Sequence, residues 1–106
     1  MTNHQSRQTA EDHYYAALDL YAEGHHGEAI TEYEAAIAAD PSFLDAMHGL
    51  ARVYQDTEQL DKAIEVANRI AELDPDDVLA HTSLSILYQR KGMVPEAEAE
   101  IGRAHV

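Results

Sequence analysis

The sequence predicts an all-α fold in which three helix-turn-helix hairpins, six helices in total, stack side by side. Residues 22–29 align with residues 56–63 and 90–97, so the chain repeats itself with an offset of 34 residues. Within each repeat, apolar residues recur at steps of three and four, the spacing that places them on one face of a helix. A fixed period of this length is typical of repeat architectures, in which neighbouring units share one core.

The limits of each element follow from this pattern. A flexible tail is expected at residues 1–8, and one domain at 9–106, with repeats at about 9–41, 42–75 and 76–106. Helices are expected at residues 9–23, 27–39, 43–57, 60–73, 77–91 and 94–105. Asp-Pro pairs at 40–41 and 74–75 separate the repeats, because proline disfavours a helical residue before it. Ser42 and Asp76 are then placed to cap the helices that follow.

Helical periodicity is clearest in the second repeat. Its first helix carries apolar residues at Leu44, Met47, Leu50, Ala51 and Tyr54, and its second at Leu60, Ile64, Ala67, Ile70 and Ala71. Between the two helices of the first and third repeats stand Gly24 and Gly92. Glycine is favoured where a helix ends in the left-handed conformation, so both positions are expected to be such ends.

Charge and composition exclude several classes of function. The chain has 20 acidic against 7 basic side chains, a net charge of -13 and no cysteine. Such a surface repels nucleic acid and anionic membranes, whereas basic peptides and cations are attracted to it. The polar start of the sequence lacks the apolar stretch of an export signal, and no apolar run is long enough for a membrane span. We expect a soluble, cytoplasmic protein.

No pattern of catalytic residues is present in the sequence. Ser83 and Ser85 lack a nucleophile motif, and the chain has no glycine-rich phosphate loop. Asp74, Asp76 and Asp77 lack the glycine and the final glutamate of a calcium loop, and fit a helix start better. We therefore expect a protein that is not an enzyme and needs no cofactor.

The histidines offer a metal-binding alternative. His25 and His26 are adjacent, with Glu23, Glu28 and Glu32 close in sequence. Adjacent side chains in a turn point in different directions and seldom hold one ion together, which favours a simple turn. A metal-responsive binding protein stays open as the alternative function. His13 and His81 occupy equivalent places two repeats apart, and we expect both to be partly buried between the helices of their hairpins.

These repeats resemble those of the tetratricopeptide repeat family. That family has a 34-residue unit with a large residue, Leu, a small residue, Tyr, Ala, an aromatic residue and Pro in order. The second repeat matches with Met47, Leu50, Ala51, Tyr54, Ala63, Ala67 and Pro75, and the first with Ala29, Tyr33, Ala36 and Pro41. The resemblance implies a right-handed superhelical stack whose first helices line a concave groove for an extended or helical peptide.

The resemblance also identifies groove positions by their place in each repeat. They are Tyr14, Leu18, Tyr21, Asp45, His48, Gly49, Arg52, Gln55, Leu79, Thr82, Ser83, Ile86 and Gln89. Members that grip the acidic tail of heat-shock chaperones carry basic and amide groups at five of these places. Here those places hold Tyr14, Leu18, Gly49, Leu79 and Ser83, so no such tail is expected to bind. The predicted function is a protein-interaction scaffold for a peptide with apolar anchors and basic flanks.

The third repeat ends at Val106 with no further helix to cover it. In a stack of this kind the outer face of the last unit is apolar, because it is built to receive a neighbour. The residues expected on that face are Leu84, Leu87, Tyr88, Ile101, Ala104 and Val106. A homodimer through the C-terminal hairpin would cover them.

Overall fold

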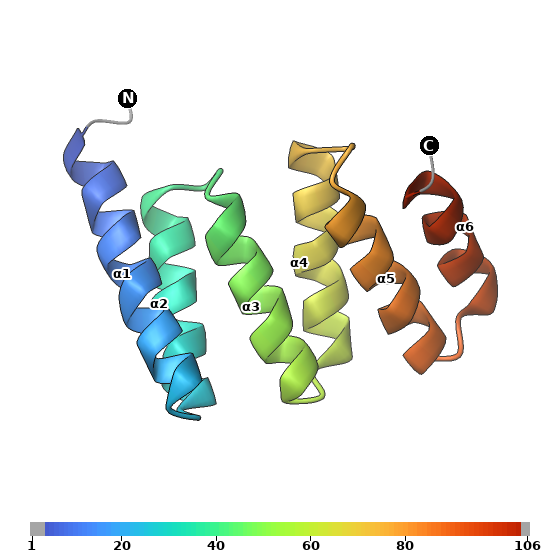
Figure 1. The fold of residues 1–106 in the computed structure, drawn as a ribbon, viewed down its shortest axis with the longest axis horizontal. Helices are drawn as coiled ribbons and strands as arrows, with labels where there is room; N and C mark the ends of the chain where they lie inside the picture. Colours follow the sequence, from blue (N-terminus) through green and yellow to red (C-terminus); the bar gives the residue numbers. More distant parts are fainter. Residues whose placement is uncertain (1–3, 105–106) are drawn as a thin grey trace.

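The computed structural model describes residues 4–104, with side chains described for residues 6–93, 96 and 99–103. These residues form six α-helices and no strand, as predicted (Figure 1). The helices are α1 (His4–Ala22), α2 (His26–Ala39), α3 (Leu44–Asp56), α4 (Leu60–Leu73), α5 (Val78–Arg90) and α6 (Val94–Ala104). Within residues 4–104, no helix combines the length and the hydropathy that crossing a bilayer requires.

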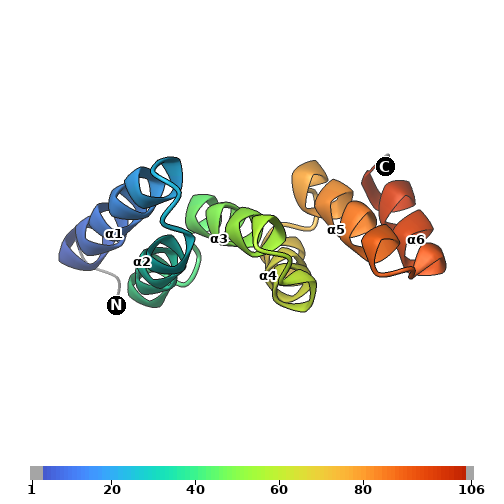
Figure 2. The ribbon, with the colours of Figure 1, turned by 90° about the horizontal axis from the view of Figure 1, so that it is seen from below.

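The helices alternate in direction, and each packs against the next one along the chain (Figure 1). The first helix α1 also contacts α3, so the first helices of the hairpins form one layer, with α2 and α4 in a second (Figure 2). The stack measures 42 × 31 × 17 Å along its principal axes. Because hairpins contact only their neighbours, each interface between them is a separate packing problem.

The turn inside each hairpin ends its first helix in the left-handed conformation. Gly24 (φ 82°) and Gly92 (φ 77°) confirm the two predicted helix ends. The middle hairpin has Glu58 (φ 61°) at the equivalent place, 34 residues from each glycine. A left-handed backbone is costly for a residue with a Cβ atom, so the middle turn is held in place by other contacts.

The turns between hairpins correct the expected helix caps. Ser42 does not cap α3, since its backbone N–H (3.2 Å) and hydroxyl (3.0 Å) both donate to the Asp40 carboxylate. Helix α5 is capped one residue later than expected: the Asp77 carboxylate accepts the backbone N–H of Ala80 at 3.0 Å, while Asp76 precedes this cap. The proline-containing turns are thus closed by the aspartate before proline, which leaves the following residue free of a capping role.

The expected tail at residues 1–8 is wrong for residues 4–8, which belong to α1. Arg7 pairs with Glu11 (3.2 Å) one helical turn ahead and with Asp40 (3.4 Å) at the end of α2. Its guanidinium also lies over the Phe43 ring, 5.5 Å from the ring centre. These contacts with the α2–α3 turn stabilise the first turns of α1, and a local reading of the sequence contains no sign of them.

Tight packing between hairpins depends on residue size. A Cβ atom at Gly49 of α3 would overlap the ring of Tyr33, which is buried in α2. The equivalent places one repeat later hold Ser83 on α5 and Ala67 on α4. The first interface therefore pairs the largest side chain with none, and the second pairs two small ones.

The expected open face of the C-terminal hairpin is partly wrong. Leu84 and Leu87 are buried within the monomer (0% and 1% exposed), because α5 packs on both α4 and α6. Ile101 is 40% exposed and Tyr88 is half-buried, whereas the side chains of Ala104 and Val106 lie outside the described residues. An apolar group does remain uncovered on α6, but it is smaller than the sequence indicates.

Candidate functional site

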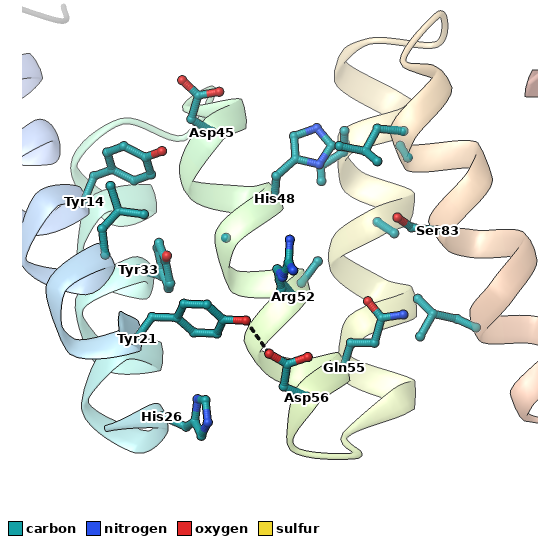
Figure 3. A pocket seen from close by; sticks show the side chains of 18 of the residues that line it. Tyr14, Tyr21, His26, Tyr33, Asp45, His48, Arg52, Gln55, Asp56 and Ser83 are labelled. Atoms are coloured by element: carbon teal, nitrogen blue, oxygen red, sulfur yellow. Dashed lines mark hydrogen bonds between the residues drawn. The ribbon is translucent and has the colours of Figure 1, made fainter. Parts of the chain in front are cut away.

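The largest hollow of the described chain is a groove across the first helices α1, α3 and α5, with a volume of about 1070 Å³ (Figure 3). Of the groove positions expected from the sequence, the structure brings together Tyr14, Leu18, Tyr21, Asp45, His48, Gly49, Arg52, Gln55, Leu79 and Ser83. Helices α1 and α5 form its two sides, and α3 forms its centre. One face of the stack therefore gathers side chains from all three repeats.

Thr82, Ile86 and Gln89 do not line the groove. They stand 34 residues after His48, Arg52 and Gln55, which face from α3 toward α5. In the same way these three residues face from α5 toward the place of a further first helix, and none follows in the described chain. Their assignment assumed that all repeats contribute alike, which fails for the last repeat of a stack.

The sequence reading missed half of the groove lining. The additional residues are His26, Tyr33, Ala51, Asp56, Glu58, Ala67, Ile70, Ala80, Leu87 and Arg90. Several come from the second helices α2 and α4, which reach the floor of the groove between the first helices. A helical step of four from Arg52 would have identified Asp56, and the 34-residue offset from Asp56 would then have identified Arg90.

Between α1 and α3 the groove is aromatic and its polar groups are paired with each other. The Tyr14 ring packs against Phe43 (5.1 Å between ring centres) and Tyr33 (6.2 Å). The Tyr21 hydroxyl donates to the Asp56 carboxylate at 2.5 Å (Figure 3). This bond to Asp56 raises the pKa of Tyr21, while the nearby Arg52 guanidinium acts in the opposite direction. Tyr21 is therefore a neutral hydroxyl that links α1 to α3.

Between α3 and α5 two ionic contacts hold the ends of the groove. At one end His48 lies 2.9 Å from the Asp77 carboxylate. Burial alone would raise the pKa of Asp77, but hydrogen bonds from His48 and the Ala80 amide hold it below its usual value. At the other end Arg90 donates to both carboxylate oxygens of Glu58, at 2.7 and 2.8 Å. The left-handed Glu58 is thus tied to the next repeat.

Two polar side chains between these contacts stay without a partner. Gln55 of α3 and Ser83 of α5 are half-buried, and neither makes a hydrogen bond to any residue that the structure describes. Both point into the groove (Figure 3). Beside them are two exposed apolar side chains, Leu79 (58%) on α5 and Leu18 (38%) on α1. The groove therefore offers unused hydrogen-bonding groups and uncovered apolar surface together.

The histidines do not converge on a metal site. No group of three His, Asp or Glu side chains within the described residues is placed to hold an ion. His25 is exposed before α2, and the His26 ring lies edge-on to Tyr21 at 5.6 Å. His13 and His81 lie between the helices of their hairpins, as expected, each 2.7 Å from a glutamate of the second helix. The metal-binding alternative gains no support from this arrangement.

A stack of helical hairpins with a groove across its first helices defines a helical repeat protein, a class built to present an extended concave surface. The tetratricopeptide repeat family model matches residues 20–87, more than half of the chain. The chain therefore belongs to the tetratricopeptide repeat family. No curated protein sequence matches it.

Solved structures share the fold over nearly all of the chain. MamA is 28% identical with a TM-score of 0.88, over 91% of this chain and 56% of MamA, so this chain spans little more than half of MamA. The Yersinia enterocolitica type III secretion chaperone SycD, in complex with a peptide of the translocator YopD, is 25% identical (TM-score 0.88, 96% of this chain and 78% of SycD). The first repeat domain of Spaghetti (RPAP3), bound to the HSP90 peptide SRMEEVD, is 19% identical (TM-score 0.86, 92% and 78%) and shares the fold alone.

Proposed function

We propose that the chain is a non-catalytic interaction module whose groove binds a peptide segment of a partner protein. The observation that carries this proposal is the combination of exposed Leu18 and Leu79 with unpartnered Gln55 and Ser83 in one groove. Peptide-bound relatives such as SycD add support by family likeness. Apolar groups at the sides and free polar groups between them are typical of a ligand site.

The partner segment is expected to carry apolar anchors with basic flanks. The net charge of -13 attracts a basic ligand, and Asp45 is exposed at one end of the groove. Binding should then weaken as salt is added, because screening reduces this attraction. Uniformly acidic partners, or binding that strengthens in salt, would contradict the basic flank but leave the groove itself in place.

Matched leucine variants test the groove. Leu18→Glu and Leu79→Glu place a charge inside it, whereas Leu73 is similarly exposed (51%) on α4 and does not line it. In a pull-down followed by mass spectrometry, we expect partners bound by the wild type and by Leu73→Glu to be lost from both groove variants. Equal capture by all four proteins would rule out the groove as the binding surface.

An acidic chaperone tail is not expected to bind. The positions that would hold its carboxylates carry Tyr14, Leu18, Gly49, Leu79 and Ser83, none of which is charged. The test is a titration with the HSP90 peptide SRMEEVD, with and without an amidated C-terminus. Micromolar affinity that depends on the free carboxylate would contradict this expectation.

The homodimer through the C-terminal hairpin is a second proposal. It is supported by Ile101 (40% exposed) on α6 and Ile86 (45% exposed) on the side of α5 that faces away from the groove. Leu87 is buried in the monomer, so Ile86→Glu and Ile101→Glu are the appropriate changes. We expect light scattering to show a dimer for the wild type in moderate salt and a monomer for the double variant.

A further inference from the structure

The two halves of the groove differ in how their polar groups are used. Between α1 and α3, Tyr21 and Asp56 bond to each other. Between α3 and α5, Gln55 and Ser83 point into the groove without a partner among the described residues. Folding has therefore left one amide and one hydroxyl available for a ligand. Each of these groups both donates and accepts a hydrogen bond.

We propose that Gln55 and Ser83 form a site that pairs with the main chain of an extended peptide, with Leu79 receiving an apolar side chain of the same peptide. This inference rests on the proposed function and adds the conformation and pattern of the ligand. The Gln55 amide offers N–H and C=O groups, as a strand edge does, and can bond both groups of one ligand residue. The Ser83 hydroxyl completes the site from α5.

Hydrogen bonding decides between an extended and a helical ligand. A helix satisfies its own backbone groups, so a helix laid in this half of the groove would bury Gln55 and Ser83 with no backbone partner. An extended segment arrives with its N–H and C=O groups unpaired and needs partners for them. Only the extended ligand satisfies both sides of the contact.

The spacing along α5 sets the expected pattern of the ligand. Leu79 and Ser83 are four residues apart on one helix, a rise of about 6 Å. In an extended chain, side chains on the same face recur every two residues, about 6.6 Å apart. A bound segment that runs along α5 is thus expected to place an apolar residue two positions from the residue whose main chain is bound. Apolar residues should alternate with polar ones.

Selection from two peptide libraries tests this inference. One library displays linear 12-residue peptides, and the other displays the same number of variable residues on a rigid helix. Both are selected on the wild type and counter-selected on Leu18→Glu. We expect enrichment of linear peptides with apolar residues at alternate positions. Enriched helical binders with apolar residues three and four apart would overturn the inference while supporting the groove. No enrichment from either library would overturn the proposed function as well.

Variants of similar side-chain volume locate the contact in the selected peptide. Gln55→Met removes the amide, and Gln89→Met is the matched control, because Gln89 has the equivalent place one repeat later and lies outside the groove. We expect Gln55→Met to weaken binding at least tenfold and Gln89→Met less than twofold. N-methylation of one peptide residue should cause the same loss, and the two losses should not add. Unchanged affinity of Gln55→Met would overturn the inference.

Discussion

The middle hairpin and its two neighbours fill the same structural position with different chemistry. Nineteen residues separate His13 from Glu32 and His81 from Glu100, and each pair joins the two helices of its hairpin at 2.7 Å. At the equivalent place the middle hairpin has Met47 and Val66, both buried. The repeat thus requires complementary partners at this position but does not specify whether they are polar or apolar.

The two polar hairpins also differ from each other in burial. The His13 and Glu32 side chains are 38% and 30% exposed, whereas those of His81 and Glu100 are 8% and 4% exposed. The second ring nitrogen of His81 lies 2.8 Å from the Pro75 carbonyl oxygen, an acceptor. Both ring nitrogens therefore donate, to Pro75 and to the Glu100 carboxylate, and His81 is an imidazolium ion. Removing one partner should cost most where water cannot replace it.

Removal of the buried carboxylate is expected to have the largest effect. Glu100→Ala leaves the His81 imidazolium buried and without its carboxylate, which should lower the free energy of unfolding by about 3 kcal/mol. Glu32→Ala, at the exposed equivalent, should cost less than about 1 kcal/mol. Urea denaturation of both variants measures the difference. Equal losses would show that burial does not separate the two pairs.

Transplanting the middle pair should have a smaller effect of opposite sign. In His81→Met with Glu100→Val, two buried charges give way to an apolar pair of the kind that already packs in the middle hairpin. We expect the double variant to be more stable than the wild type by roughly 1 kcal/mol, and more stable than either single variant. If the double variant is the least stable of the set, the His81 pair is a net source of stability.

The same pair should make stability depend on pH. Hydrogen bonds to the Pro75 carbonyl and to Glu100 raise the pKa of His81, with burial and Arg103 acting against them. A raised pKa in the folded state gives a stabilisation that is complete below the unfolded value of about 6.5 and is lost as pH rises through the folded value. Thermal unfolding across this window should show a decline for the wild type that the Met/Val double variant lacks.

The smallest expected effect concerns the turn of the middle hairpin. Glu58→Gly should relieve a left-handed conformation that costs about 1 kcal/mol for a residue with a Cβ atom. It also removes the pairing with Arg90, which is worth no more than about 0.5 kcal/mol because Glu58 is 73% exposed. We expect a net gain of roughly 0.5 kcal/mol by urea denaturation, and a net loss for Glu58→Ala. Equal stability of the Gly and Ala variants would show that the backbone is not strained.

Periodic features of the structure could be predicted from the sequence, whereas contacts unique to one place could not. The 34-residue offset predicts the hairpins, the left-handed Gly24 and Gly92, and the position of His81 between helices. It does not predict Arg7 on the Phe43 ring, because that contact has no equivalent in the other repeats. Its assumption of equal repeats also placed Gln89 in the groove, although the last repeat has no following neighbour there. The His81 partner was within reach, since His13 and Glu32 recur at the same offset.

The contact between Tyr33 and Gly49 fixes the order of the hairpins along the chain. If the first and third hairpins were joined directly, the Tyr33 ring would meet the side chain of Ser83, in a space that at present holds only a hydrogen atom of Gly49. If the second hairpin were duplicated, Ala67 would face Gly49 and leave a void. Recombination between these repeats would therefore produce misfitted neighbours, so the similarity of the units does not make them interchangeable modules.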